Sequence, residues 1–257
     1  MIINLNARQG EYMSLSDRRD ELLNMLSPSA PTGVRTIAEK LFISEPTVRR
    51  DLKELAAEGL VIRTHGGVML SSPAADKSLP LCSREFLMSE QKDSICRQAA
   101  EIVKNGDVVM LDNSTTALHM VPYLKNKKDI IVITNGIRLA EALCPENIKC
   151  LMTGGQVKTE AYGLIGADAV KFLSGYNADV CFFSCRGISP DGRLTDTSVG
   201  EDEIRAAMMA RSKKSVLLAD SSKFGLTFWH NLCHIGELDE VFSDADIDIS
   251  DYAKDNR

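Results

Sequence analysis

The chain has 257 residues, of which 44% are hydrophobic and 26% charged, and a formal net charge of −6. These fractions are ordinary for a globular protein, and the net charge alone argues against a nucleic-acid binder. No apolar run approaches the roughly 18 residues of a membrane-spanning helix, and the first residues lack a secretory signal, so we expect a cytoplasmic protein without a membrane partner. The seven cysteines form no C-x-x-C pair, which indicates neither a disulfide framework nor a four-cysteine zinc site. Translation can start at Met1 or at Met13.

The negative charge is distributed unevenly. Residues 1–70 carry nine Lys/Arg and nine Asp/Glu, so the whole net charge lies in residues 71–257. The stretch 71–80 is rich in Ser, Ala and Pro and shows no helical or strand period, which is typical of a linker. We therefore expect a small domain over residues 1–70, a linker over 71–80 and a larger domain over 81–257.

Three short helices are predicted in the first domain. Apolar residues recur at helical spacing over 15–26 and again over 34–42. A third helix opens at Ser44, which is a good N-cap residue, and ends before Gly59. The turn 42–44 joins the second and third helices in only three residues, which is typical of a helix-turn-helix.

The polar side of the third helix is suited to reading DNA. Its apolar residues Val48, Leu52 and Leu55 share one face, so the remaining side chains point elsewhere. Such a helix places its N-terminal residues in the major groove, where Arg pairs with guanine and Thr contacts thymine. The β-branched stretch 60–68 surrounds a glycine pair and predicts a wing whose cations contact phosphates. The residues expected to bind DNA are Arg35, Ser44, Glu45, Thr47, Arg49, Arg50, Lys53, Arg63 and His65.

A family signature covers this region. Residues 36–70 read TIAEKLFISEPTVRRDLKELAAEGLVIRTHGGVML, and this run resembles the N-terminal domain of the DeoR/GlpR family of bacterial transcriptional regulators. The matching residues are Ser44, Thr47, Arg49, Arg50, Asp51, Leu52, Gly59, Leu60, Arg63, His65, Gly66 and Gly67. The alternative is a solvated helix whose i,i+4 ion pairs only add helical stability. Because a carboxylate is repelled by phosphate, we expect Asp51 to be held by an Arg or a helix end.

From residue 81 the pattern changes to helices that alternate with short apolar runs. Helices are expected near 89–104, 115–126, 136–144, 164–174 and 200–212, and strands at 108–111, 130–133, 148–152, 180–183 and 216–219. Runs buried on both faces and separated by helices predict an α/β domain with a mostly parallel sheet. In such sheets, ligands bind beyond the carboxyl ends of the strands.

The resemblance to the DeoR/GlpR family continues over most of residues 84–244. Matching positions include Arg84, Lys92, Asp107, Asp112, Thr115, Thr116, Thr134, Asn135, Gly154, Gly155, Gly163, Gly166, Asp179, Gly187, Asp191, Glu201, Asp220 and Lys223. The resemblance implies a fold similar to ribose-5-phosphate isomerase and a sensor of a phosphorylated sugar. It also implies a repressor of a carbohydrate-catabolism operon, with double-stranded operator DNA as its partner and without enzymatic activity.

Polar residues gather where the predicted strands end. Hydroxyls and free backbone N–H groups between a strand and a helix favour a phosphate. The residues expected to bind the effector are Asp112, Ser114, Thr115, Thr116, Thr134, Asn135, Gly154, Gly155, Arg186, Glu201 and Lys223. The structural alternative is that the hydroxyls only cap helices and that Lys223 pairs with Asp220.

This chain departs from the family at the predicted ligand loops. Ser114 and Ser184 occupy positions where the family has glycine, and Arg186 stands at a position that is usually small. Side chains there narrow the site, and Arg186 adds a permanent positive charge. We therefore expect an effector that is smaller or more anionic than the family's common hexose and triose phosphates, such as a phosphorylated sugar acid. The alternative is that Arg186 points to solvent or to Glu201.

Three further expectations concern assembly, chemistry and metals. Because one helix-turn-helix offers few base contacts, we expect a homodimer or homotetramer. A different class of function is a sugar-phosphate isomerase with a DNA-binding appendage, in which Asp112, Glu201 and Lys223 act on protons. His230 and His234 have the i,i+4 spacing of a zinc-binding pair if that segment is helical, but no cofactor or metal is expected.

Overall fold

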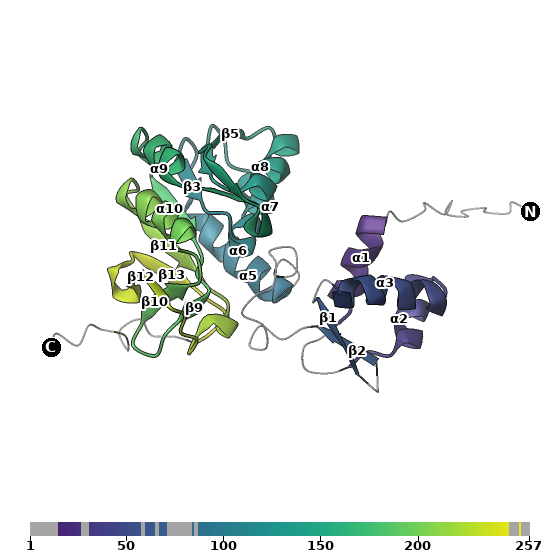
Figure 1. The fold of residues 1–257 in the computed structure, drawn as a ribbon. Helices are drawn as coiled ribbons and strands as arrows, with labels where there is room; N and C mark the ends of the chain where they lie inside the picture. The colour runs from purple at the N-terminus through teal and green to yellow at the C-terminus, as the bar shows by residue number, and fades with distance from the viewer. Residues whose placement is uncertain are drawn as a thin grey trace, which may run out of the picture. The chain divides into compact units, whose positions relative to one another are not determined.

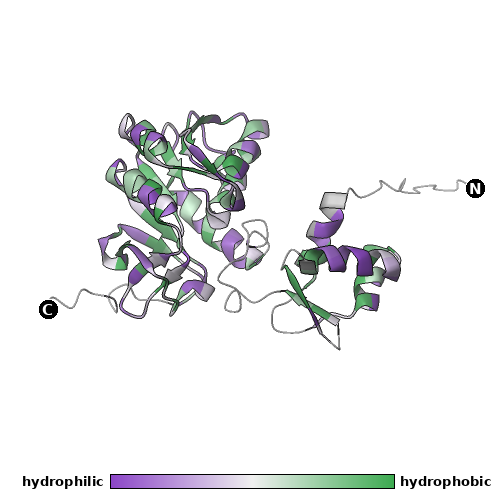
Figure 2. Cartoon of the chain, in the orientation of Figure 1, coloured by the Kyte–Doolittle hydropathy of each residue, from purple (hydrophilic) through white to green (hydrophobic). Residues whose placement is uncertain are grey.

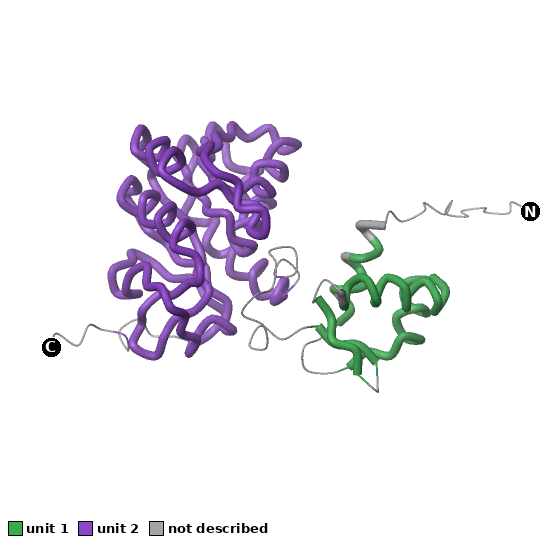
Figure 3. Tube along the Cα trace, viewed as in Figure 1, with its two compact units in different colours: residues 1–79 green, residues 80–257 purple. Residues whose placement is uncertain are grey.

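The chain divides into two compact units, residues 1–79 and residues 80–257, shown in Figure 3. The computed structural model describes residues 15–26, 31–57, 60–64, 67–70, 84, 87–246 and 252. The expectations about Met13, Gly59, His65 and the linker 71–80 concern positions outside these residues. In the described ranges, no helix has the length and apolar character needed to cross a membrane.

The first unit is a helix-turn-helix followed by a two-stranded wing, as the sequence predicts. Its elements are α1 (Leu15–Asn24), α2 (Val34–Leu41), α3 (Glu45–Ala57), β1 (Val61–Thr64) and β2 (Gly67–Leu70). The three helices bury a shared core of Leu22, Leu23, Ile37, Val48, Leu52 and Leu55. Phe42 ends α2 in a left-handed conformation with φ 54° and is 94% exposed.

The wing is antiparallel and is anchored to the segment before α2. Thr32 and Val68 form a β-bridge through two backbone hydrogen bonds of 2.8 and 2.9 Å. Gly67 lies at φ +147°, and a Cβ atom there would lie 2.2 Å from the carbonyl oxygen of Thr32. Only glycine fits at such a close approach, which gives a physical reason for glycine in this part of the family signature.

The second unit is built on a six-stranded parallel sheet. The strands are β3 (Val108–Leu111), β4 (Ile131–Thr134), β5 (Lys149–Met152), β8 (Val180–Phe183), β11 (Ser215–Leu218) and β13 (Glu240–Phe242). Their order across the sheet is β13-β11-β8-β3-β4-β5, and every neighbouring pair is parallel. Five of these strands are predicted from sequence; β13 is missed because it is a three-residue, half-buried edge strand.

Helices cover both faces of this sheet, as Figure 1 shows. The helices are α5 (Ser89–Ala99), α6 (Thr115–Leu118), α7 (Val121–Leu124), α8 (Ile137–Leu143), α9 (Ala167–Ser174) and α10 (Val199–Ala210). Val109 and Leu111 pack with α5 to α8, whereas Met110 between them packs with α9 and α10. Because the strands are buried on both faces, they are apolar along their length, which is visible as green in Figure 2.

The structure differs from the predicted elements in three further places. The helix expected over 164–174 begins only at Ala167, because residues 163–165 form β7 (Gly163–Ile165), which pairs with β6 (Gln156–Lys158) in a hairpin. The helix expected over 115–126 is divided into α6 and α7, and Pro122, which lacks an N–H, lies in the first turn of α7. A second sheet of β9 (Gly187–Ile188), β10 (Arg193–Asp196) and β12 (His230–His234) is absent from the sequence prediction.

Candidate functional site: a DNA-reading surface and a strand-end site

The first candidate surface is the exposed side of α3 and the wing. Ser44 caps α3: its Oγ accepts a hydrogen bond of 3.3 Å from the Thr47 backbone N–H and lies 2.8 Å from Thr47 Oγ1. Arg50, Lys53 and Arg63 are exposed, and none of them forms an ion pair within the described residues. These three cations are therefore available to an external anion.

Two other predicted DNA contacts are held in exposed ion pairs. Arg49 bonds Glu45 at 3.0 Å, and Arg35 bonds Glu39 at 2.9 Å, both at i,i+4 spacing. The alternative interpretation, in which i,i+4 ion pairs stabilise the helix, therefore describes contacts that are present. Exposed ion pairs contribute at most about 1 kcal/mol to stability, so these arginines can easily exchange a carboxylate for a DNA phosphate. Arg35, Glu45, Arg49 and Arg63 line one hollow of about 320 Å³ between α2, α3 and the wing.

The carboxylate of Asp51 faces away from this surface. Asp51 is 2% exposed and receives two hydrogen bonds from Arg18, of 2.7 Å from Nε and 3.1 Å from an Nη atom. The expectation that an Arg holds this carboxylate is confirmed. The pair fastens α3 to α1 and keeps the carboxylate of Asp51 away from the exposed cations of α3.

The second candidate site lies at the carboxyl ends of the parallel strands. The chain leaves β3 toward β4 and β5 and returns on the other side of β3 as β8, so the strand order reverses between β3 and β8. Ligands in open α/β sheets bind at such a switch point. Two predicted effector-binding segments, 112–116 after β3 and 184–186 after β8, therefore meet at this position.

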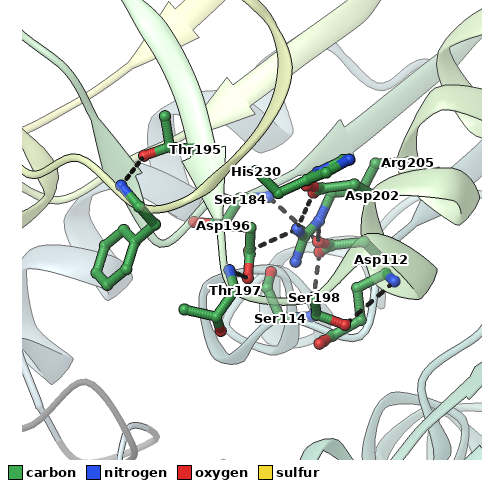
Figure 4. A network of polar contacts seen from close by, with 12 residues as sticks. Asp112, Ser114, Ser184, Thr195, Asp196, Thr197, Ser198, Asp202, Arg205 and His230 are labelled. Atoms are coloured by element: carbon green, nitrogen blue, oxygen red, sulfur yellow. Dashed lines mark hydrogen bonds and ion pairs between the residues drawn. The ribbon is translucent and has the colours of Figure 1, made fainter.

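A buried guanidinium organises the switch point (Figure 4). Arg205 of α10 is 5% exposed and pairs with three carboxylates: Asp112 at 3.0 Å, Asp196 at 2.7 Å and Asp202 at 2.8 Å. Burial opposes its charge, yet Asp196, Asp112 and further carboxylates raise its pKa well above the ordinary value. His230 Nδ1 lies 2.7 Å from the second oxygen of Asp202 and extends the network outward.

Asp112 connects the loops that follow β3 and β8. One of its oxygens accepts the Ser114 N–H at 3.1 Å, and the other accepts the Ser184 N–H at 3.3 Å together with Arg205 Nε. Asp112 has no exposed surface. In this arrangement, Asp112 holds the loops after β3 and β8 together, and both of its carboxylate oxygens accept hydrogen bonds from protein donors.

The β6–β7 hairpin is fastened across the ends of β3 and β4. Asn135 donates hydrogen bonds to Asn113 Oδ1 at 3.2 Å and to the Leu164 carbonyl at 3.1 Å. Asn113 donates to Glu201 Oε1 at 2.9 Å, and Lys158 Nζ donates to Glu201 Oε2 at 2.6 Å. Asn135 and Glu201 thus hold the hairpin, while Asn135 Oδ1 is buried without a hydrogen-bond partner in the described structure.

The remaining predicted effector residues separate into covered and accessible groups. Thr115, Thr116 and Thr134 are at most 5% exposed, and Ser114 Oγ caps α6 by accepting the Ala117 N–H at 3.1 Å. The accessible group consists of Ser114, Gly154, Gly155, Arg186 and Lys223, each partly or fully exposed. Neither Arg186 nor Lys223 forms an ion pair with a described residue, so the pairs with Glu201 and Asp220 that the sequence left open do not form.

The helical premise of the zinc alternative is wrong. His230 and His234 lie on strand β12, where i,i+4 positions are far apart along the strand. His230 bonds Asp202, and His234 Nε2 lies 2.8 Å from the Asp191 carbonyl oxygen. Over the described part of the chain, no three His, Cys, Asp or Glu residues come together as metal ligands.

Glu201 gives a pH-dependent test of the hairpin contacts. Burial acts to raise its pKa, but Arg205, Lys158 and Asn113 outweigh burial and lower it from 4.5 to about 2. Its ionised form therefore stabilises the fold above about pH 4.5, and this contribution is lost as the pH falls toward 2. We expect Glu201→Gln to lower the melting temperature at pH 7 and to lose less stability than the wild type between pH 5 and pH 2. Equal pH slopes in thermal melts of the two proteins would contradict this assignment.

Comparisons with known proteins match both units. A model of the DeoR-like helix-turn-helix domain matches residues 18–74, and a model of the DeoR C-terminal sensor domain matches residues 87–245. The chain is also similar to ribose 5-phosphate isomerase A from Methanocaldococcus jannaschii, with a TM-score of 0.41, 17% identity and coverage of 53% of this chain and 55% of that one.

Curated relatives match over nearly the whole chain. The glycerol-3-phosphate regulon repressor of Escherichia coli is 29% identical over 234 residues, which cover 91% of this chain and 92% of the relative. The HTH-type transcriptional repressor GlcR of Bacillus subtilis is 32% identical over 233 residues, which cover 90% and 89%. The chain therefore belongs to the DeoR family and is a DNA-binding transcriptional regulator rather than an enzyme.

Proposed function

We propose that the protein represses a carbohydrate-catabolism operon and that a phosphorylated sugar or sugar acid changes its affinity for operator DNA. Residues 1–70 bind DNA and residues 81–257 bind the effector. The observation that carries the DNA part is the set of exposed cations Arg50, Lys53 and Arg63 on the recognition helix and wing, which have no ion pair within the described residues. One relative regulates a glycerol-3-phosphate regulon, which fits a phosphorylated effector.

Residues of α3 and the wing divide the work of recognition. Thr47, Arg49 and Arg50 lie in the first two turns of α3, where a recognition helix meets base edges. Arg35, Arg63 and His65 contact phosphates and set the register, without reading sequence. Glu45 and Ser44 shape the start of α3: Ser44 by capping it and Glu45 by holding Arg49 until DNA replaces it.

The effector site is the switch point between β3 and β8. Ser114 and Arg186 contribute accessible groups there, and Gly154 and Gly155 after β5 and Lys223 after β11 contribute accessible groups at neighbouring strand ends. The loops are held in shape by buried residues, namely Asp112, Thr115, Thr116, Thr134, Asn135 and Glu201. Since Asp112 and Glu201 are paired with Arg205 and Lys158, no free carboxylate base of the kind that an isomerase needs lies among these residues.

An effector acts only if it binds the DNA-competent and DNA-incompetent arrangements with different affinity. We propose a homodimer or homotetramer. In it, effector binding favours one of the two arrangements and thereby moves two recognition helices relative to paired half-sites. The test is nuclease footprinting of the full-length protein on the DNA upstream of its own gene, with and without individual sugar phosphates. A protected repeat that a sugar phosphate removes or creates is expected; protection that no phosphorylated metabolite changes would refute the effector part.

A further inference from the structure

Three cations from separate segments converge beside the switch point. Arg84 precedes α5, Arg186 follows β8, and Lys223 ends the short helix η4 (Ser221–Lys223) after β11. A bridge between Ile188 and Phe224, with the Gly225 N–H donating to the Ile188 carbonyl at 2.8 Å, places the segments of Arg186 and Lys223 side by side. Arg84 lies close enough to Arg186 and Lys223 for their positive charges to repel one another.

None of the three cations forms an ion pair with a described residue. Two nearby carboxylates are already engaged, Glu201 by Lys158 at 2.6 Å and Asp196 by Arg205 at 2.7 Å, and a third, Asp220, attracts Lys223 without forming an ion pair with it. Moreover, Arg84 Nε is buried and has no hydrogen-bond partner in the described structure. A buried donor without an acceptor costs free energy and indicates a missing partner such as a ligand or ion.

The charge balance of the cluster also favours an anion. Burial, followed by repulsion from Arg186, lowers the pKa of Arg84 to about 10. Burial likewise lowers the pKa of Lys223, and Arg84 and Arg186 add to the effect even though Asp220 opposes it. Holding these three positive charges close together costs electrostatic free energy. A bound anion offsets this cost by pairing with all three.

We propose that Arg84, Arg186 and Lys223 bind a second anionic group of the effector, a carboxylate or a second phosphate, so that the ligand is anionic at both ends. This assignment rests on the proposed effector site at the strand ends. Lys223 follows β11 and Ser114 follows β3, two strands away and therefore about 10 Å across the sheet. An extended sugar phosphate spans that distance, with its phosphate at one end of the site and its acidic group at the other.

Matched ligands test the proposal. Full-length protein is titrated by calorimetry with pairs that differ only at the end opposite the phosphate: 6-phosphogluconate against sorbitol 6-phosphate, 3-phosphoglycerate against glycerol 3-phosphate, and two bisphosphates against the matching monophosphates. We expect one carboxylate or bisphosphate member to bind at least about tenfold more tightly than its neutral-ended counterpart, as charge-assisted hydrogen bonds imply. A carboxylate preference and a bisphosphate preference distinguish the two sources of the second anion.

Variants then assign the preference to the cluster. Arg186→Ala and Lys223→Gln are expected to remove the preference for the acidic or bisphosphate ligand. Arg193→Ala alters an exposed arginine of β10 that pairs with Asp191, and this variant is expected to keep the preference. Each variant must keep the ligand-free melting temperature of the wild type, and Arg186→Gln serves as the replacement if Arg186→Ala unfolds. Equal affinity of acidic and neutral members, or no binding by any acidic or bisphosphate member, overturns the proposal. Operator binding is measured separately. If the wild-type protein does not bind its operator, that result overturns the proposed function and not the assignment of the cation cluster.

Discussion

Replacing Arg205 by leucine is expected to destabilise the second unit by about 3–5 kcal/mol, because it leaves the buried carboxylates Asp112, Asp196 and Asp202 without their cation. For a unit of this size, that loss lowers the melting temperature by roughly 6–20 °C. Differential scanning calorimetry of the full chain measures it, since the transition of the second unit shifts while that of the first unit stays in place.

The matched control is Arg193→Ala. Arg193 also pairs with an aspartate, Asp191 at 2.9 Å, but both side chains are more than half exposed. An exposed pair contributes at most about 1 kcal/mol, so the melting temperature is expected to change little. Similar shifts for the two variants would mean that Arg205 does not neutralise a buried cluster, and the structural account of the switch point would be wrong.

Replacing Arg50 by alanine is expected to weaken binding to the operator tenfold to hundredfold, the equivalent of about 1–3 kcal/mol for a lost bidentate contact with a base. Arg50 lies on the exposed side of α3 and has no ion pair within the described residues, so the substitution breaks no ion pair of the described structure. Fluorescence anisotropy with labelled operator measures the change, and an unchanged melting temperature shows that folding is intact.

The kind of contact that Arg50 makes is read from non-operator DNA. If Arg50 reads a base, Arg50→Ala lowers operator affinity much more than affinity for random DNA; a uniform loss with a shallower salt dependence would show a phosphate contact instead. Lys171→Ala changes an exposed cation on α9 of the second unit and is expected to leave both affinities unchanged. Wild-type affinity of the Arg50 variant would contradict the assignment of α3 as the recognition helix.

The sequence predicts the local architecture well because its signals are local. The helix-turn-helix follows from two apolar periods and a three-residue turn, and Ser44 caps α3 as its residue type predicts. Strands β3 and β8 are found at the predicted residues because apolar runs buried on both faces have few alternative structures. The order of these strands along the chain does not give their order across the sheet, in which β8 lies beside β3.

The contacts made over long sequence separations could not be derived in the same way. Arg205 is separated from Asp112 by 93 residues and Lys158 from Glu201 by 43, and periodicity carries no information about such pairs. One signal was available: Arg205 lies four residues after Glu201 and three before the buried Met208, so a cation shares the inward face of α10 with apolar residues. The β6–β7 hairpin is missed because three-residue strands are too short for a period of two to be recognised.

We propose that the first unit reads a specific DNA sequence under the control of the second. The most direct test is a competition titration of the full-length protein, at about 150 mM salt, between DNA from its own promoter and scrambled DNA of equal length. We expect a preference of at least about a thousandfold for the promoter, as is usual for specific repressors. Equal affinity for the two DNAs, falling in parallel as salt is added, would contradict it.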